Sequence, residues 1–510
     1  MIARDGSRTS LWQEIEAYES RPERAKDIVY DVIIVGGGIT GVSTALRLQE
    51  AGKQCLLLEA ANLGFGTTGG TTAHLNTLLD TPYSTIEKKF SKEVAAGVAG
   101  WARAAIDMIT ENISRYGIQC DFKEMDACLY AVNESQAEQL KEIEEAAIRA
   151  GLTISAAGQI PIPGNFTKAI SVKKQARFSP LKYVFSLAQA FEEKGGTIKQ
   201  DCRVTGYHDE ETVRVETEKS EFKASNLVFA THIPPGINLL HLRCAPYRSY
   251  AIAVKLKDNL TLESLVYDME DPYHYYRTHP VDGINYLVAG GKDHKTGTEK
   301  NTPYRFTELE ALVRKKFSVE EISYSWSSQY YEPVDGLPYI GTLPGHSSRV
   351  LTATGFGGNG MIYSQVAAMI LSSTILNKAD STTEIFRPGR IKPIAGFKDF
   401  VSHNANVVKE LAAKPFSGEK LSSLAEIAAG EGRVIKYEGN KIAICKDEKG
   451  QVHTLSPSCS HMQCDVQWNG AEESWDCPCH GARYAMNGQV ITGPSYKGLE
   501  QAYLIKKPAK

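Results

Sequence analysis

The sequence predicts a layered α/β domain followed by a small all-β domain. From about residue 28 to residue 378, short β-branched runs alternate with helical stretches, which is the pattern of α/β domains. From about residue 424, the chain has only short strands separated by turns, for example at residues 434–437 and 441–444. The length of 510 residues has room for about two to four domains of roughly 150 residues each.

We expect four segments along the chain. Residues 1–27 are an N-terminal extension, and residues 28–378 are the α/β domain. Residues 379–423 contain several turn signals, such as RPGR and KPFSG, and are therefore expected to be a connector. Residues 424–510 are the all-β domain.

Charge and hydropathy exclude several classes of protein. The 57 basic and 60 acidic residues nearly cancel, which argues against a nucleic-acid partner or an anionic membrane surface. The first 30 residues carry charges throughout and lack the apolar core of a signal peptide. The longest uncharged run, residues 32–46, is too short to span a bilayer. We therefore expect a cytoplasmic protein with no membrane span.

The first chemical motif is a glycine loop that follows a buried strand. The strand DVIIV at residues 31–35 leads into GGGITG at residues 36–41 and then a helical stretch, and a second apolar run ends in an acid. This order of strand, glycine loop, helix and acid is typical of dinucleotide binding, with the phosphates at the helix N-terminus and the acid at the ribose. The residues expected to bind the dinucleotide here are Gly36, Gly38, Ile39, Thr40, Gly41 and Glu59.

The same glycine pattern occurs twice more, at residues 64–69 and 355–360. Neither copy is followed by a second strand that ends in an acid. We therefore do not interpret these two copies as separate dinucleotide sites.

The second chemical motif is a cluster of cysteines and histidines near the C-terminus. Four of the ten cysteines lie within residues 459–479, and the sequences CSH and CPCH each supply cysteine and histidine together. Such a donor set can bind zinc or a Rieske [2Fe–2S] cluster, in which two histidines bind one iron and two cysteines the other. Zinc sites more often pair like residues in each loop, so the pattern favours the iron–sulfur cluster and leaves zinc as the alternative.

Residues 28–378 resemble FAD-dependent oxidoreductases of the D-amino-acid oxidase type. The resemblance rests on DVIIVGGGITG with Glu59, on GFGTTGGTTAHL, and on DGLPYIG followed by TGFGGNGM. It implies a Rossmann-like FAD-binding fold with an α+β substrate subdomain. In that family the late glycine turn aims a helix N-terminus at the flavin edge that becomes negative on reduction. Further FAD contacts implied by the resemblance are Gly66, Thr67, Thr71, Thr72, Val204, Gly357, Gly358, Asn359, Gly360 and Met361.

Residues 424–505 are similar to Rieske proteins of the respiratory-complex type, through the Trp-Asp-Cys-Pro-Cys-His-Gly segment and the later Gly-Pro loop. The resemblance implies that Cys459 and Cys477 bind the inner iron and that His461 and His480 bind the outer, solvent-facing iron. It also implies a disulfide between Cys464 and Cys479, although disulfides are rare in cytoplasmic proteins.

One position departs from the high-potential Rieske pattern. Those members have a serine whose hydroxyl bonds a cluster sulfur, and this chain has Ala482 there, whereas Tyr484 retains the other donor. Hydrogen bonds to sulfur stabilise the reduced cluster. The sequence therefore predicts a potential below the top of the Rieske range of roughly −150 to +300 mV.

The sequence indicates fewer candidate substrate-binding residues than cofactor-binding residues. Strand alternation predicts that Tyr275 and Arg277 share one face, where the arginine could bind a substrate carboxylate; a half-exposed strand with a solvated arginine is an equally good interpretation. His74 is a candidate catalytic residue near the flavin N5, or a hydrogen-bonded core residue. Trp326, Tyr330 and Tyr331 are candidates for the pocket wall or for core packing.

The two halves together resemble FAD-dependent oxidoreductases fused to a C-terminal Rieske domain. This resemblance implies an enzyme that oxidises an amine or amino-acid-like small molecule at FAD. Electrons then pass singly through the cluster to an external acceptor. The alternatives are an NAD(P)H-driven reductase that feeds a partner protein, and a non-catalytic redox sensor. No second nucleotide motif supports the reductase.

Overall fold

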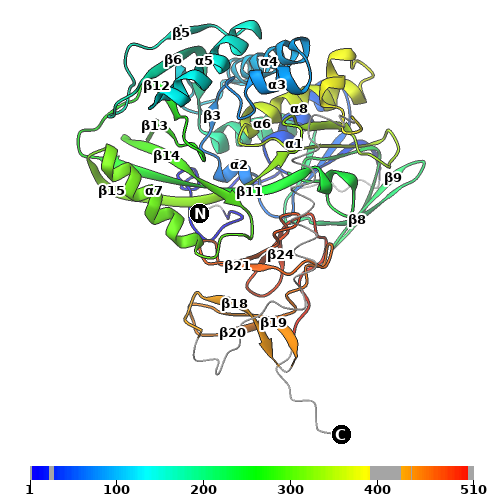
Figure 1. Cartoon of the computed structure of the whole chain (residues 1–510). Helices are drawn as coiled ribbons and strands as arrows, with labels where there is room; N and C mark the ends of the chain where they lie inside the picture. Colours follow the sequence, from blue (N-terminus) through cyan, green and yellow to red (C-terminus); the bar gives the residue numbers. More distant parts are fainter. Residues whose placement is uncertain (1–2, 22–27, 391–426, 438, 503–510) are drawn as a thin grey trace.

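The computed structural model describes residues 3–21, 28–390, 427–437 and 439–502. Within these residues the chain forms a large α/β body with a small β head below it (Figure 1). This arrangement confirms the predicted fold class. Residues 391–423 of the predicted connector lie outside the described residues.

The first sheet of the body contains the strand of the first glycine motif. In the described chain its main order is β16-β17-β10-β1-β2-β7, and β8 and β9 form a hairpin beside β10. β1 pairs in parallel with both β2 and β10, and its central residues are fully buried, as expected for a parallel strand covered on both faces. The strands are β1 (Val29–Val35), β2 (Cys55–Leu58), β7 (Thr197–Lys199), β8 (Val204–Asp209), β9 (Val213–Thr217), β10 (Glu221–Phe229), β16 (Tyr339–Thr342) and β17 (Val350–Thr354).

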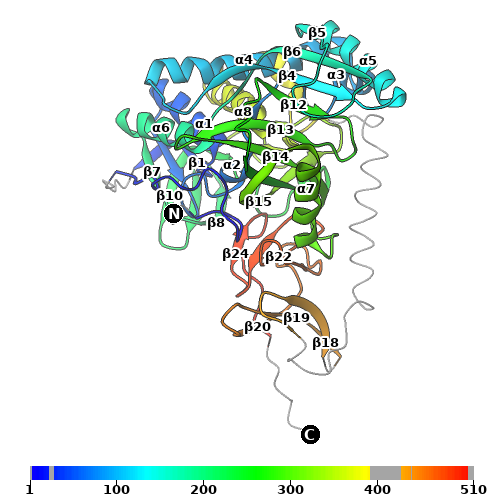
Figure 2. The ribbon, with the colours of Figure 1, turned by 90° about the vertical axis from the view of Figure 1, so that its left-hand side faces the viewer.

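The second sheet of the body is mostly antiparallel, and its main order is β15-β11-β14-β13-β12-β4-β6-β3, with β5 beside β6. It corresponds to the predicted α+β substrate subdomain, and Figure 2 shows β12, β13, β14 and β15 at successively lower positions on the body, with β11 between β14 and β15 in the sheet. The strands are β3 (His74–Leu75), β4 (Lys123–Ala131), β5 (Ile154–Ala156), β6 (Lys168–Arg177), β11 (Cys244–Leu256), β12 (Ser264–Asp268), β13 (Tyr275–Val281), β14 (Ile284–Lys295) and β15 (Val319–Pro333).

The helices cover both sheets. α1 packs against α6 and α8 in the main hydrophobic core, and α7 packs on β11 and β14. In the described residues no helix is long and apolar enough to cross a membrane. The helices are α1 (Ile39–Glu50), α2 (Thr67–Gly70), α3 (Tyr83–Lys89), α4 (Lys92–Tyr116), α5 (Glu134–Arg149), α6 (Pro180–Glu193), α7 (Thr302–Lys316) and α8 (Gly360–Ile375), with the 3-10 turns η1 (Leu239–Leu242) and η2 (Ser381–Phe386).

The head consists of two small antiparallel sheets. The sheet β21–β24 lies between the body and the sheet β18–β20 (Figures 1 and 2). The strands are β18 (Gly432–Tyr437), β19 (Asn440–Lys446), β20 (Val452–Leu455), β21 (Gln467–Asn469), β22 (Ser474–Asp476), β23 (Arg483–Ala485) and β24 (Val490–Thr492).

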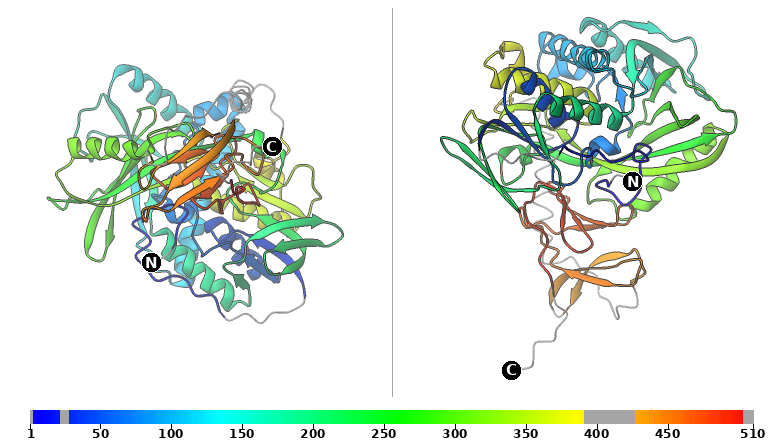
Figure 3. Two further views of the ribbon diagram at one scale, coloured as in Figure 1. Left: turned by 90° about the horizontal axis from the view of Figure 1, so that it is seen from below. Right: turned by 180° about the vertical axis from the view of Figure 1, so that it is seen from behind.

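The N-terminal segment packs on the body along residues 3–21 (Figure 3). Leu11 and Trp12 are buried in the main core, and the Trp12 indole donates a hydrogen bond to the carbonyl of Thr71 at 2.6 Å. Ser10 donates to the carbonyl of Gly69 at 2.6 Å. The N-terminal segment therefore stabilises the loop that contains Gly69 and Thr71. The sequence pattern did not indicate this role.

The first glycine loop has no room for a side chain where the helix approaches it. A Cβ at Gly41 would overlap the carbonyl oxygen of Gly36, and Gly36 itself has a φ of 113°. Both positions therefore require glycine, the first for close packing and the second for its left-handed backbone.

We expect Gly41→Ala to destabilise the protein by about 1–3 kcal/mol and to lower FAD retention, because α1 must move away from the loop to accommodate the methyl group. Thermal unfolding and the flavin content of purified protein measure both effects. Gly100→Ala is the matched control, because Gly100 is exposed on α4 with nothing near the added Cβ. An unchanged melting temperature and flavin content for Gly41→Ala would contradict the packing argument.

Candidate functional site

A cavity of about 270 Å³, here called the cofactor cavity, extends along the glycine loops of the body. It connects the N-terminus of α1 with the N-terminus of α8, two positive helix ends suited to phosphates and to a reduced flavin. Most residues predicted to bind FAD line it: Gly36, Gly38, Ile39, Thr40, Glu59, Gly66, Thr67, Thr71, Val204, Gly357, Gly358, Gly360 and Met361.

Three residues of the predicted FAD set lie outside this lining. Gly41 instead packs α1 against the loop. Thr72 and Asn359 line a neighbouring cavity. The structure thus gathers the motif residues from distant parts of the chain around one elongated space, which fits a dinucleotide.

Glu59 lies at the carboxyl end of β2, where the motif predicts it. It is 9% exposed, and its Oε2 accepts a hydrogen bond from the backbone N–H of Gly37 at 2.6 Å. Its Oε1 accepts from the N–H of Ala61 at 2.8 Å. Burial raises the pKa of Glu59, and these backbone donors oppose the rise.

A second cavity of about 260 Å³, here called the side cavity, adjoins the cofactor cavity at the α8 end. Both cavities share Thr71, Ser249, Tyr330, Gly358 and Met361 as lining residues. A small molecule in the side cavity would therefore lie next to the part of the cofactor cavity that α8 faces.

His74 and Tyr275, both predicted site residues, line the side cavity. The His74 Nδ1 lies 2.7 Å from the hydroxyl of Tyr267, and its ring contacts both tyrosine rings edge-on. Burial, and next the charge of Arg277, hold the pKa of His74 well below its usual value. His74 is therefore a neutral imidazole at physiological pH.

The structure does not support the predicted carboxylate contact of Arg277. Arg277 is fully buried, is not part of the side-cavity lining, and donates through Nε to the carbonyl of Thr72 at 2.6 Å. Its guanidinium carbon lies 5.2 Å from the centre of the Trp12 ring. The physical reason is that the N-terminal segment supplies an alternative, aromatic partner for this charge.

The tyrosine and tryptophan candidates for the pocket wall differ in whether they line a cavity. Tyr330 lines both cavities and Tyr331 lines the cofactor cavity, whereas Trp326 is buried beneath and donates to the carbonyl of Gly70 at 2.7 Å. Tyr330 and Tyr331 are adjacent in β15, and their side chains diverge because neighbouring residues of a strand alternate faces.

Two acidic residues of the side cavity were missed by sequence reasoning. Asp80 accepts from the hydroxyl of Tyr273 at 3.0 Å and from the N–H of Gly358 at 2.6 Å. Asp293 accepts from the hydroxyl of Tyr330 at 2.8 Å. The two aspartates are more than 200 residues apart and belong to no motif, so only tertiary structure brings them together.

The head places the four predicted cluster ligands on two facing loops. The hydroxyl of Tyr484 lies 3.1 Å from the Cys459 sulfur, and the rings of His461 and His480 have centroids 5.1 Å apart. The pKa of Cys459 is lowered to about 6, chiefly by a hydrogen bond from Cys477 and then by Tyr484. Nδ1 of His461 is buried without a hydrogen-bond partner among the described residues. Two sulfurs and two imidazoles in this arrangement fit a Rieske cluster.

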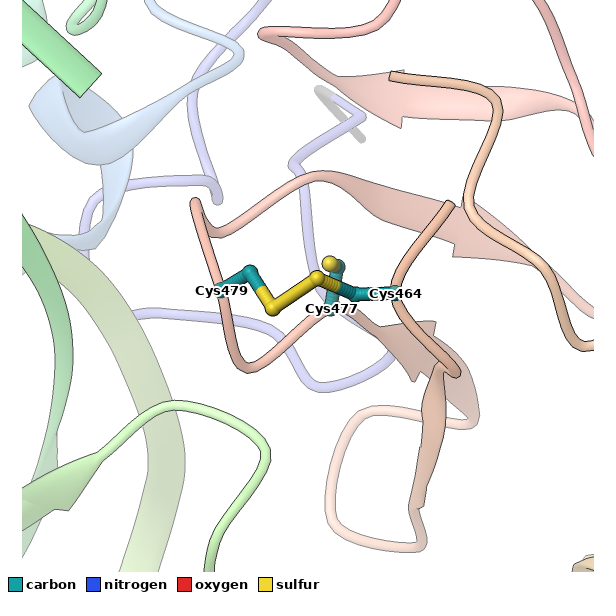
Figure 4. A group of neighbouring side chains, drawn as sticks. All are labelled: Cys464, Cys477 and Cys479. Carbon is teal, nitrogen blue, oxygen red and sulfur yellow. A yellow bond between two sulfur atoms is a disulfide. The ribbon is translucent and has the colours of Figure 1, made fainter. Parts of the chain in front are cut away.

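The predicted disulfide between Cys464 and Cys479 is present, with an S–S distance of 2.02 Å. Figure 4 shows Cys477 beside it, and the three sulfurs lie within 4.8 Å of one another. These three cysteines are not a metal site of their own, because two of the sulfurs are already bonded to each other.

The histidine edge of the head faces the body, not solvent, which corrects the prediction of a solvent-facing iron. His480 is 1% exposed, and Nε2 of His461 lies 3.0 Å from the carbonyl oxygen of Gly236. The ring of His241, in η1, lies against both, with centroids 4.5 Å from His461 and 5.6 Å from His480. The imidazole of His241, which belongs to the body, therefore covers the edge of the head that carries His461 and His480.

Side chains of β15 connect the head to the cofactor cavity. Nε2 of Gln329 donates to the carbonyl of Gly481 at 2.8 Å, and the hydroxyl of Tyr331 donates to the carbonyl of His480 at 3.2 Å. Both side chains also line the cofactor cavity. Gln329 and Tyr331 thus contact both the cofactor cavity and the loop that carries His480.

A buried charge cluster holds the head against the body. Glu472 of the head accepts from the N–H and hydroxyl of Ser327 at 3.1 and 2.6 Å, and it pairs with Arg4 at 3.3 Å. Arg248 of the body pairs with Asp476 of the head at 3.4 Å. Burial raises the pKa of Glu472, but Arg4, Arg248 and further positive charge lower it more, so the carboxylate stays ionised.

We expect Ala482→Ser to raise the reduction potential of the cluster, because a hydroxyl there adds a hydrogen bond that stabilises the reduced state. Tyr484→Phe is the opposing variant and is expected to lower it, since the Tyr484 hydroxyl already lies 3.1 Å from the Cys459 sulfur. A redox titration followed by EPR measures both. Potentials that stay at the wild-type value would contradict this assignment of the donors.

Comparison with known proteins identifies both parts of the chain. The family of FAD dependent oxidoreductases (DAO) matches residues 31–374, and the Rieske [2Fe-2S] domain matches residues 419–503. The chain is 32% identical over 495 residues to the Rieske 2Fe-2S iron-sulfur protein YhfW of Bacillus subtilis, covering 96% of this chain and 97% of the other. It is 25% identical over 373 residues to the gamma-glutamylputrescine oxidoreductase of Escherichia coli, covering 70% of this chain and 85% of the other.

Solved structures share the fold of the body. Glycine oxidase from Geobacillus kaustophilus superposes with a TM-score of 0.57 at 19% identity, covering 71% of this chain and 99% of the other.

Proposed function

Since the chain belongs to the FAD dependent oxidoreductase (DAO) family and carries a Rieske [2Fe-2S] domain, we propose that it oxidises a small amine or amino-acid-like molecule in the side cavity and passes the electrons singly through the cluster to an external acceptor. The observation that carries this proposal is the position of β15. Tyr330 faces the side cavity, and the next residue, Tyr331, contacts the loop of His480.

FAD, when bound, supplies a two-electron acceptor, and the [2Fe–2S] cluster supplies a one-electron carrier. The residues of the chain position these groups. Cys459, Cys477, His461 and His480 would hold the cluster, and the buried charge cluster with Gln329 and Tyr331 would keep it close to the flavin. An oxidase reoxidised by oxygen alone has no need of such a one-electron path.

The substrate class is supported by the relatives and by the shape of the site. The Escherichia coli relative is named for a substrate that contains an amine. The side cavity has a volume of about 260 Å³, is lined by tyrosines, aliphatic residues and polar groups, and adjoins the α8 end of the cofactor cavity. An external acceptor would meet the head on a surface other than the histidine edge, which the body covers.

The proposal is tested by an anaerobic titration of the purified holoprotein that follows flavin absorbance and the cluster EPR signal together. We expect a small amine to bleach the flavin and a reduced-cluster signal to follow. Bleaching by NADH or NADPH, with none by any amine or amino acid, would replace the proposal with the reductase alternative. Bleaching by neither class would favour the redox sensor.

We expect Glu472→Gln to slow electron transfer from flavin to cluster while leaving flavin reduction by substrate unchanged. The substitution removes the buried ion pair between Arg4 and the head and leaves Arg4 with Asp5 of its own segment as counter-charge, and breaking a buried pair costs up to about 3–5 kcal/mol. Stopped-flow absorbance separates the two steps. Glu310→Gln is the matched control, because its pair with Arg314 is exposed and contributes about 0.3–0.5 kcal/mol. Equal rates of cluster reduction in wild type and Glu472→Gln would contradict the docked electron path.

A further inference from the structure

We infer that the side cavity binds its substrate as an organic ammonium ion without a carboxylate beside the reacting carbon, with Asp80 and Asp293 as the charge partners. This inference rests on the proposed function, since it takes the side cavity to be the substrate site. It replaces the broader class of amines and amino acids with cationic amines.

The charged groups of the side cavity are all acidic. Among the described residues that line it, Asp80, Asp268 and Asp293 are present and neither lysine nor arginine occurs. Asp268 is already occupied, since its two oxygens bond the backbone N–H and the ring of His274 at 2.8 and 2.9 Å. Asp80 and Asp293 therefore set the charge of the cavity.

Asp293 has unused bonding capacity. Its Oδ2 accepts from Tyr330, but its Oδ1 has no hydrogen-bond partner among the described residues although it is shielded from bulk solvent. The hydroxyl of Ser249 lies 3.2 Å from that of Tyr275. Burial raises the pKa of Asp293 to about 6, and the charge of Asp80 adds to the rise, whereas the hydrogen bond of Ser249 to Asp293 lowers the pKa of this carboxyl. A bound ammonium ion would supply both the missing partner and the compensating charge.

The aromatic walls of the cavity also suit a cation. Tyr267, Tyr273, Tyr275 and Tyr330 all line it. The rings of Tyr273 and Tyr275 have centroids 5.8 Å apart, and those of Tyr267 and Tyr273 have centroids 6.4 Å apart. Tyrosine faces attract ammonium groups, most strongly where water is excluded.

A carboxylate would find no positive partner in the same place. The guanidinium of Arg277 is directed to the carbonyl of Thr72 and to the Trp12 ring, outside the lining. A carboxylate in the side cavity would instead lie close to Asp80 and Asp293, and juxtaposed like charges cost several kcal/mol. The cavity thus discriminates against the carboxylate of an amino acid while it accepts the amine.

The acids also fit the charge changes of the oxidation. The ammonium first loses a proton, which a cavity carboxylate can accept. The C–H bond next to nitrogen would then break, with FAD, when bound, supplying the two-electron acceptor for the hydride, and the nitrogen lone pair would form the C=N bond of an iminium ion. The substrate is again a cation after this step, and a fixed carboxylate stabilises that developing positive charge.

The test compares amines with the amino acids that differ from them by one carboxylate. The pairs are pyrrolidine with proline, and dimethylamine with N-methylglycine. Binding to the anaerobic holoprotein is measured from the perturbation of flavin absorbance, and flavin reduction is followed in the same cuvette. We expect each amine to bind about tenfold or more tightly than its carboxylated partner.

Variants test which residues make the side cavity prefer an amine to its carboxylated partner. Asp293→Asn is expected to weaken amine binding about tenfold and to reduce the ratio of the two dissociation constants within each amine and amino-acid pair. Asp80→Asn is a second, independent variant for which we expect the same direction of change. Asp258→Asn, the same substitution on an exposed turn, is the matched control.

Three outcomes would overturn the inference: proline or N-methylglycine binding as tightly as its amine partner, a ratio that neither cavity variant changes, or no perturbation by either amine. If the amines bind with the expected preference but never reduce the flavin, the cation site stands and the proposed oxidation of these amines fails.

Discussion

The arrangement of the whole molecule depends on the buried charge cluster between body and head. Arg4 of the N-terminal segment, Arg248 of the body and Glu472 and Asp476 of the head meet where water is largely excluded. Charges in such a place are tolerated only when each has a partner in good geometry. The buried charge cluster therefore specifies one position of the head on the body. In that position the edge of the head that carries His461 and His480 faces the body.

This docking gives β15 a double role. Its residues 329–331 touch the side cavity, the cofactor cavity and the histidine-bearing loop within three consecutive positions. Strand alternation makes this possible, because adjacent side chains leave the backbone in opposite directions. One strand consequently contacts the side cavity, the cofactor cavity and the histidine-bearing loop.

Sequence reasoning identified the parts of the site that depend on local chemistry. The glycine loop at Gly36–Gly41 and the acid Glu59 are recognisable because turns and helix starts need particular residues at short spacing. The disulfide between Cys464 and Cys479 was expected from the resemblance to Rieske proteins. The positions of the candidate substrate residues were harder to predict from the sequence. Tyr275 lies in the side cavity, but Arg277 lies under the N-terminal segment, since alternation predicts a face and not what covers it.

The sequence by itself thus indicated the fold class, the dinucleotide loop and the Cys/His donor set, because each of these motifs needs particular residues close along the chain. The resemblance to known families specified FAD and the [2Fe–2S] cluster. Only the tertiary structure decided the acidic character of the side cavity, the covered histidine edge and the bracing by Trp12. These features join residues from separate segments, such as Asp80 with Asp293 and His241 with His461. No short-range pattern carries that information, because it arises only when the sheets pack and the buried charges find their partners.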